Sequence, residues 1–148
     1  MGRWSRQIAP LFLDWLVPGP ALDWVEVGCG TGALTAQILA RADPSYVAAV
    51  EPSAGFIAKA QSGINDPRIS FVVGNAQSLA LPTASADIVV SALMLNFIPD
   101  RPKALSEMRR ILRPGGTLAF YVWDYPGGGV EFMRAFWTAA TALEPAAR

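Results

Sequence analysis

The sequence contains no histidine, and Cys29 is its only cysteine. Without histidine the chain cannot form a Ser-His-Asp triad, a Cys-His nucleophile pair or a metal site with imidazole ligands. One cysteine also excludes an intrachain disulfide and the thiolate sets of zinc ribbons and iron–sulfur clusters. We therefore expect no metal site. A single thiol is typical of a reducing compartment, so we expect a cytoplasmic protein.

Net charge and long apolar runs are lacking as well. The 12 Lys and Arg residues balance the 12 Asp and Glu residues, so no net field favours nucleic acid or an anionic membrane. No stretch approaches the ~18 apolar residues of a membrane-spanning helix. With 148 residues, of which 52% are apolar and 16% charged, the composition predicts one globular domain that binds neither nucleic acid nor membrane.

Apolar runs and helical patterns alternate along the chain. Expected strands cover residues 22–27, 45–51, 68–74, 86–93 and 117–123, and expected helices cover 4–16, 32–41, 53–64, 100–112 and 130–143. The sequence RPGG at 113–116 carries the stop signals of the fourth helix. This alternation predicts an α/β fold with a parallel sheet and helices on both faces. We expect a single domain over 1–148, with an N-terminal helix within 1–20, a sheet core over 21–125 and a final helix over 130–143.

The stretch VEVGCGTGALT, residues 25–35, follows the first expected strand. Gly28, Gly30 and Gly32 carry no Cβ, so the backbone can turn sharply and approach a ligand closely. Thr31 lies beside them, and the following helix offers free N–H groups. The letters from Gly28 to Ala33 also fit the dinucleotide pattern G-x-G-x-x-A. The glycines alone are therefore compatible with a dinucleotide, with a different cofactor, or with a tight turn that binds no ligand.

Two acidic residues flank these glycines. Glu51 ends the second expected strand 23 residues after Gly28, where a carboxylate can accept hydrogen bonds from a ribose diol, although such an acid alone is typical of a solvated strand end. Glu26 lies inside the first strand, and a buried carboxylate costs several kcal/mol unless it is paired or hydrogen-bonded. A cofactor with a positively charged end explains Glu26 better than one that carries a pyrophosphate.

Two further strand ends offer polar groups. The Asn75 amide and the Ala76 N–H follow the third strand and can read an adenine edge, although Asn75 alone is also typical of an ordinary turn. Residues 91–96 follow the fourth strand, where a second substrate would approach the cofactor. The letters ALMLNFI in this region are equally typical of apolar helix contacts.

In these motifs the sequence resembles the class I S-adenosylmethionine-dependent methyltransferases, particularly those that act on small molecules. The matching stretches are VEVGCGTGALT, VAAVEPS, GNAQSLALP, ADIVVSALMLNFIPD and ILRPGGTLAFYVW, in this order along the chain. The resemblance implies a Rossmann-like doubly wound sheet of five parallel strands in the order 3-2-1-4-5, flanked by helices. It also implies S-adenosyl-L-methionine as cofactor and methyl transfer to a small-molecule acceptor by in-line displacement.

The resemblance also implies a set of cofactor-binding residues. The methionine moiety would be held by Glu26 and by the loop residues Gly28, Cys29, Gly30, Thr31 and Gly32. The ribose would be bound by Glu51, and the adenine would be contacted by Pro52, Ser53, Asn75, Ala76 and Gln77. The set is completed by Ser91 and by the lid residue Trp4, which lies beside Arg3 and Arg6, either of which could also reach the methionine end. The family more often has Asp where this chain has Asn75, which keeps the acceptor and loses the charge. Relatives often carry histidine after the fourth strand, where Asn96 cannot act as a base, so no catalytic residue is assigned.

The family fold ordinarily continues with two further strands, so we expect a chain truncated at its C-terminus. The strand TLAFYVW would then be an exposed sheet edge, which favours pairing with a second copy, an exchanged segment or a separately encoded remainder. Methyl transfer remains the leading interpretation. The alternatives are a module that binds S-adenosylmethionine without turnover and, less favoured, an NAD(P)-dependent oxidoreductase. For Cys29 we favour a small loop residue over a nucleophile.

Overall fold

A computed structural model describes residues 2–125 and 130–146. Its five strands form one parallel sheet in the order β3-β2-β1-β4-β5, so the predicted topology is confirmed. The strands are β1 (Asp23–Val27), β2 (Tyr46–Glu51), β3 (Ile69–Val73), β4 (Ala86–Ala92) and β5 (Leu112–Tyr121). The helices are α1 (Gly2–Leu16), α2 (Ala33–Arg41), α3 (Ala54–Gly63), α4 (Arg101–Ile111) and α5 (Glu131–Leu143), with a 3-10 turn η1 (Leu95–Phe97).

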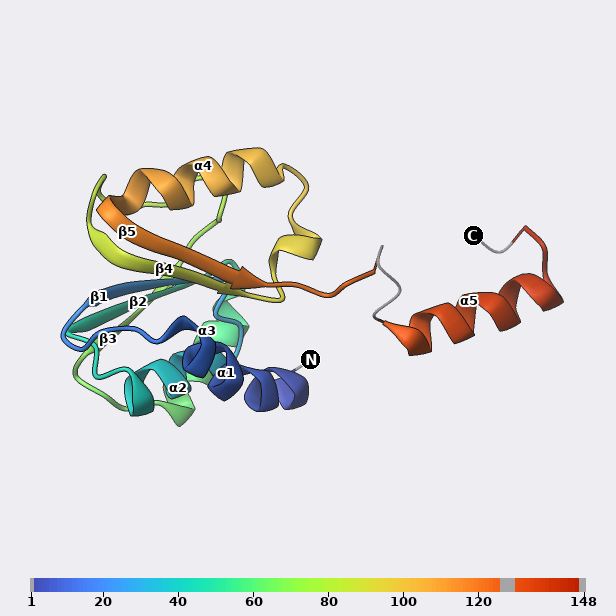
Figure 1. Cartoon of the computed structure of the whole chain (residues 1–148), viewed down its shortest axis with the longest axis horizontal. Helices are drawn as coiled ribbons and strands as arrows, with labels where there is room; N and C mark the ends of the chain where they lie inside the picture. The colour runs from blue at the N-terminus through green and yellow to red at the C-terminus, as the bar shows by residue number, and fades with distance from the viewer. Residues whose placement is uncertain (1, 126–129, 147–148) are drawn as a thin grey trace.

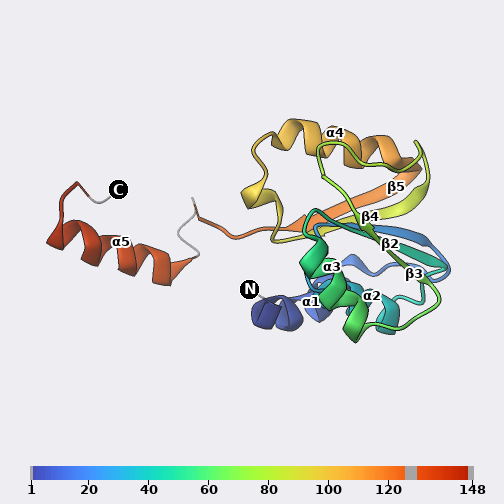
Figure 2. The same cartoon turned by 180° about the vertical axis from the view of Figure 1, so that it is seen from behind.

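Helices cover both faces of the sheet (Figures 1 and 2). Helices α1, α2 and α3 lie on one face and α4 lies on the other. On the α1 face, Trp24 and Val90 pack against Phe12 and Ile38; on the α4 face, residues of α4 pack against β1 and β4. Because both faces are covered, β1, β2 and β4 consist almost entirely of buried residues, as their continuous apolar character predicts.

The last strand differs from the prediction. The helix-stop signal in RPGG is confirmed, because α4 ends at Ile111, but β5 begins at once at Leu112 instead of at residue 117. Residues 113–116 form an irregularity, since Leu112 pairs with Ala86 while Thr117 pairs with Ile88. Gly115 has a φ of 81°, which glycine adopts without strain, so the letters that read as a loop form a bulge within the strand.

Strand β5 lies at one edge of the sheet, as predicted. Beyond it, α5 stands apart from the sheet and its flanking helices in both views, and none of its residues is buried (Figures 1 and 2). No helix in the described ranges combines the length and apolar character that a membrane crossing requires.

Candidate cofactor site

The loop after β1 turns sharply at the carboxyl edge of the sheet. Gly28, Gly30 and Gly32 have φ angles of 80°, 55° and 83°, in the left-handed region that other residues disfavour. The loop is fastened to β2, because the N–H groups of Gly28 and Cys29 donate to the Val50 carbonyl over 2.8 and 3.1 Å. The sharp turn that the glycines predict is therefore confirmed.

The three glycines have different surroundings. A Cβ at Gly28 would clash with the Met94 side chain, and one at Gly32 would lie 2.6 Å from the Ile64 Cδ1. A Cβ at Gly30 would meet no other atom within 4 Å. The close contact with Met94 therefore requires glycine at position 28, the positive φ favours it at position 32, and Gly30 faces open space that a ligand can fill.

Glu51 connects the glycine loop to the turn after β2. Its Oε2 accepts from the Gly30 N–H over 3.1 Å, and its Oε1 accepts from the Ser53 N–H over 3.1 Å. Although the residue is only 8% exposed, each oxygen retains a lone pair for a further donor. Glu51 is thus a positioned, buried acceptor at this edge and not a solvated strand end. Pro52 follows it, and the Ser53 hydroxyl caps α3 by accepting from the Phe56 N–H.

Glu26 brings a second carboxyl group close to this edge. It is 1% exposed, and the Thr35 hydroxyl of α2 donates to its Oε2 over 2.5 Å. Burial, reinforced by the charge of Glu51, raises the pKa of Glu26 to about 7, while the Thr35 hydrogen bond opposes that rise. Burial of Glu26 was predicted, and a positive group beside it would favour its ionised form.

Two buried hydroxyl groups lie at the ends of β4 and β5. Within the described part of the chain, neither the Ser91 Oγ nor the Tyr121 Oη has a hydrogen-bond partner. Tyr121 belongs to the cluster on the α1 face, and burial together with the charge of Glu26 raises the pKa of its phenol to about 12. Since buried polar groups nearly always make hydrogen bonds, these two hydroxyls are candidates to bond a ligand.

Cys29 lies within the glycine loop and is buried. Burial first, and then the charges of Glu26 and Glu51, raise the pKa of its thiol, so the group stays protonated. Because the thiolate is the reactive form, this environment favours the interpretation of Cys29 as a small loop residue.

The loop after β3 has the geometry of a turn. The Asn75 Oδ1 accepts from the Gln77 N–H over 2.9 Å, and Asn75 forms an isolated bridge with Ser78. These bonds fit the ordinary turn interpretation of Asn75, whose side chain is exposed. Adenine contacts by Asn75, Ala76 and Gln77 stay a prediction.

The remaining predicted residues lie at the surface. Thr31 is exposed beside the glycine loop, and Trp4 is 51% exposed on α1. Arg6 is also exposed, whereas the Arg3 side chain lies outside the described residues. Contact of these residues with a cofactor stays a prediction.

Asn96 connects the turn after β4 to the chain that follows β5. Its Oδ1 accepts from the Trp123 N–H over 2.8 Å, and its Nδ2 donates to the Trp123 carbonyl over 3.0 Å. Asn96 therefore fastens the chain after β5 to the turn after β4. Strand β5 ends at Tyr121, before the predicted limit at residue 123, because its partner strand β4 ends at Ala92, with which Tyr121 is paired.

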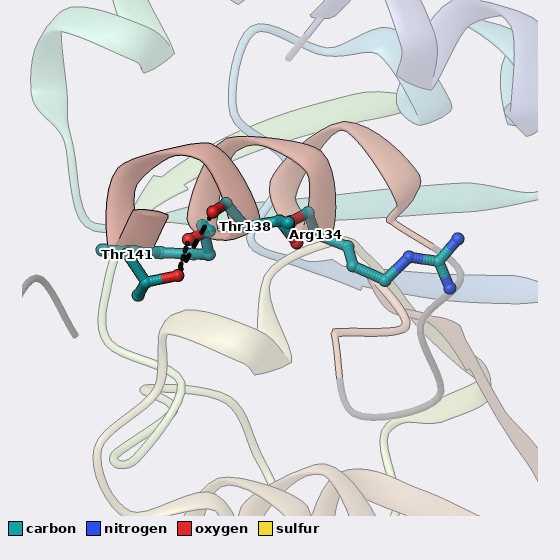
Figure 3. A pocket seen from close by; sticks show the side chains of 4 residues that line it. Arg134, Thr138 and Thr141 are labelled. Carbon is teal, nitrogen blue, oxygen red and sulfur yellow. Dashed lines mark hydrogen bonds between the residues drawn. The ribbon is translucent and has the colours of Figure 1, made fainter. Parts of the chain in front are cut away.

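Two surface hollows lie away from the glycine loop. One is lined by Arg134, Trp137, Thr138 and Thr141 of α5, where the hydroxyls of Thr138 and Thr141 bond back to helix carbonyls (Figure 3). The other lies at the amino end of the sheet, between residues 16–22 and 113–117. Neither hollow is lined by a residue of the glycine loop.

The polar groups at the carboxyl edge of the sheet fit S-adenosylmethionine. Gly30 leaves room for a ligand, Glu51 offers acceptors suited to a diol, and Glu26 offers a carboxyl suited to a cationic group. The orphaned Tyr121 hydroxyl adds a donor near Glu26. A pyrophosphate would instead meet the Glu26 carboxyl close to this loop, which disfavours a dinucleotide.

Sequence reasoning missed Thr35, Met94 and Tyr121. Thr35 stands nine residues after Glu26 on the next helix, and only the spatial fold brings the two together. In the sequence Met94 is typical of an ordinary apolar residue, although in the structure its side chain covers Gly28. Tyr121 lies in an apolar strand, and its hydroxyl is the one feature of the sequence that could have indicated a polar role.

Comparison with known proteins gives concordant results. Residues 25–120 match the family described as "Methyltransferase domain". Over 111 residues the chain is 37% identical to a trans-aconitate 2-methyltransferase of Deinococcus radiodurans, covering 74% of this chain and 42% of that protein. It is 38% identical over 114 residues to an uncharacterized methyltransferase of Mycobacterium tuberculosis, covering 77% and 57%. The chain thus spans about half the length of these curated relatives.

A solved structure agrees with this assignment. The S-adenosylmethionine-dependent methyltransferase of Mesorhizobium loti superposes with a TM-score of 0.67 at 27% identity, covering 75% of this chain and 51% of that one. The match over residues 25–120 includes the glycine loop, Glu51 and the turns after β3 and β4. The chain belongs to the class I S-adenosylmethionine-dependent methyltransferases.

Proposed function

We propose that this chain binds S-adenosyl-L-methionine at the carboxyl edge of its sheet and transfers the methyl group to a small-molecule acceptor. The observation that carries the proposal is the Glu51 carboxylate, which bridges the Gly30 and Ser53 N–H groups beside the open space at Gly30. A ribose diol that donates to both oxygens would complete this arrangement.

Glu26 and Tyr121 would serve the opposite end of the cofactor. The Glu26 carboxyl, ionised beside an ammonium group, would offset that charge, and Thr35 would orient it through its hydrogen bond. The Tyr121 hydroxyl would donate to a polar atom of the methionine moiety, which supplies the partner that it lacks within the described chain. Ser91, Trp4, Thr31 and the turn at residues 75–77 belong to the proposed site as flanking contacts.

When bound, S-adenosylmethionine supplies an activated methyl group that reacts by in-line displacement. The protein therefore has mainly to position the acceptor and to exclude water. Cys29 is poorly suited to act as a nucleophile, because its thiol stays protonated, and Asn96 is engaged by Trp123. An acceptor that is already nucleophilic fits this lack of an evident base.

The trans-aconitate 2-methyltransferase relative supports a small, polar acceptor. We further propose a single domain over residues 1–148, because the described strands form one sheet, and a cytoplasmic location, because a single cysteine is typical of a reducing compartment.

Calorimetry with S-adenosylhomocysteine tests the cofactor assignment. Wild type should bind, and Glu51→Ala should weaken binding at least tenfold, because each lost charge-assisted hydrogen bond is worth about 1.5–3 kcal/mol. Glu131→Ala, on exposed α5, is the matched control and should bind normally. Equal binding by wild type and Glu51→Ala would remove Glu51 from the site.

Transfer of labelled methyl groups to a panel of small carboxylic acids, phenols and amines tests turnover. Product formation supports the enzyme, whereas cofactor binding without any product favours the binding module. Binding of NADH in the absence of S-adenosylhomocysteine binding would overturn the cofactor assignment.

A further inference from the structure

Glu26 is a buried carboxyl group without a positively charged partner among the described residues. Its neighbours on the adjacent strands are Ala49 of β2 and Val90 of β4, which are both buried and apolar. The Thr35 hydroxyl donates the hydrogen bond that its Oε2 accepts. A buried carboxylate needs a countercharge or several hydrogen bonds, so this environment stabilises the ionised form of Glu26 poorly.

The ionisable groups that face Glu26 from β2, β5 and the glycine loop add no positive charge. Glu51, at the end of β2, is a second carboxyl group, and its charge raises the pKa of Glu26. The Cys29 thiol and the Tyr121 phenol both have a raised pKa and are uncharged near neutral pH. Burial, with this contribution from Glu51 and against the Thr35 hydrogen bond, raises the pKa of Glu26 to about 7.

The helices on this face of the sheet do not supply a countercharge either, as far as their side chains are described. Arg6 of α1, Arg41 of α2 and Lys59 of α3 are all exposed, and Arg41 is ion-paired with Asp14. None of these cations acts on the pKa of Glu26. A bound ligand that carries a positive charge would therefore change the environment of Glu26 more than any described side chain does.

We propose that the cofactor site exchanges a proton for a positive charge: Glu26 holds a proton while the site is empty and releases it to solvent when the α-ammonium group of the cofactor binds. This inference rests on the proposed function, because it takes the carboxyl edge as the cofactor site. The bond that breaks is the carboxyl O–H bond of Glu26, and its proton passes to water while the ammonium group keeps its own protons. A carboxylate beside an ammonium group forms a charge-assisted hydrogen bond, whereas a neutral carboxyl group leaves the ligand charge uncompensated.

The exchange makes cofactor affinity depend on pH near neutrality. The chain has no histidine, and the Cys29 thiol stays protonated, so Glu26 is the described side chain that titrates at about pH 7. Free Glu26 is about nine-tenths protonated at pH 6 and about one-tenth protonated at pH 8. S-adenosylhomocysteine, which carries the same ammonium group, should therefore bind roughly tenfold more tightly at pH 8 than at pH 6.

Calorimetry in buffers of different ionisation enthalpy measures the released proton. The wild-type chain should release about 0.9 proton per S-adenosylhomocysteine at pH 6 and about 0.1 at pH 8. Glu26→Gln keeps an acceptor for Thr35 and has no proton to release, so its proton count should be zero and its affinity the same at both pH values. Glu131→Gln, at an exposed position of α5, is the matched control and should behave as wild type.

A ligand without the ammonium group tests the cause of the release. 5′-Methylthioadenosine shares the adenine and the ribose with the cofactor and lacks the amino-acid end. Its binding should release no proton and should be equally tight at pH 6 and pH 8, in wild type and in Glu26→Gln. Proton release with this ligand, or equal release by wild type and Glu26→Gln with S-adenosylhomocysteine, would overturn the proposal.

The same titrations separate this inference from the proposed function. Binding of S-adenosylhomocysteine with no proton release at pH 6 and with equal affinity at both pH values would refute the proton exchange and leave the cofactor site in place. No binding at either pH would refute both.

Carbon-13 NMR of the glutamate-labelled chain gives a readout that needs no ligand. The Glu26 carboxyl signal, identified by its absence from Glu26→Gln, should titrate with a midpoint near pH 7 in the free protein. Saturating S-adenosylhomocysteine should move this midpoint to lower pH. A midpoint near the ordinary value of 4.5 in the free protein, or one that the ligand leaves unchanged, would overturn the proposal.

Discussion

The Thr35 hydroxyl donates a hydrogen bond to the Glu26 Oε2, and this bond ties the first turn of α2 to the centre of the sheet. Both residues are buried, so the carboxyl group has exchanged water for a single described hydroxyl donor. Its pKa is raised from 4.5 to about 7, chiefly by burial. The pair therefore links the stability of the fold to pH.

Glu26 should make the free energy of unfolding fall as pH rises from about 4.5 to 7. In this window the folded state keeps the Glu26 proton while the unfolded state loses it, so the unfolded state binds fewer protons. The loss should approach roughly 3 kcal/mol and then level off. Urea denaturation between pH 5 and pH 8 measures it. Glu26→Gln, which cannot ionise, should lose this slope, and an unchanged slope would contradict the assignment.

Replacing Thr35 by Val should destabilise the protein by about 1–3 kcal/mol, because the buried Glu26 carboxyl loses its donor. The pKa of Glu26 should also rise further, since the lost bond opposes the effect of burial. Urea denaturation and the pH slope report these two effects. Thr35→Ser keeps the hydroxyl and should retain most of the stability and the original slope. Equal stability and equal pH slopes of the Thr35→Val and Thr35→Ser variants would show that the hydrogen bond contributes little to stability.

Alanine at Gly28 and at Gly30 should separate structure from ligand binding. Both positions have positive φ, so each substitution costs about 1–2 kcal/mol of backbone strain. Gly28→Ala should cost more because its Cβ meets Met94, whereas Gly30→Ala meets nothing. We expect Gly30→Ala to fold and to lose affinity for S-adenosylhomocysteine. Thermal melts and calorimetry measure the two effects, and normal binding by Gly30→Ala would place the ligand elsewhere.

The sheet order followed from the family resemblance, whereas the limits of the strands and helices before β5 could be predicted from the residues, because buried parallel strands are apolar runs and helices carry their own stop signals. The sequence could not predict the bulge at residues 113–116, since Pro and Gly are equally typical of loops. Burial of Glu26 followed from its place inside a strand, and its partner Thr35 did not. Likewise, no local sequence pattern predicts the hydrogen bonds between Asn96 and Trp123, because they form only when the ends of β4 and β5 lie side by side.

Asn96→Ala should release the chain after β5. The variant loses two hydrogen bonds to the Trp123 backbone, which should lower the free energy of unfolding by about 1–3 kcal/mol. Hydrogen exchange at the Trp123 amide should accelerate more than exchange in the central strand β1. Asn96→Asp retains an acceptor for the Trp123 N–H and should be intermediate. Slow exchange at Trp123 in the alanine variant would show that other contacts hold this segment.

Tyr121→Phe should separate a ligand-binding hydroxyl from a structural one. Within the described chain the Tyr121 Oη is buried without a partner, so its removal should leave the free energy of unfolding unchanged or slightly increased. If the hydroxyl donates to the methionine moiety, affinity for S-adenosylhomocysteine should fall about tenfold, as expected for one lost hydrogen bond of ~1.4 kcal/mol. Calorimetry and urea denaturation on the same samples measure both quantities. Tyr125→Phe, at an exposed position beyond β5, is the control and should change neither. Reduced stability with unchanged affinity would instead mean that the hydroxyl serves the fold.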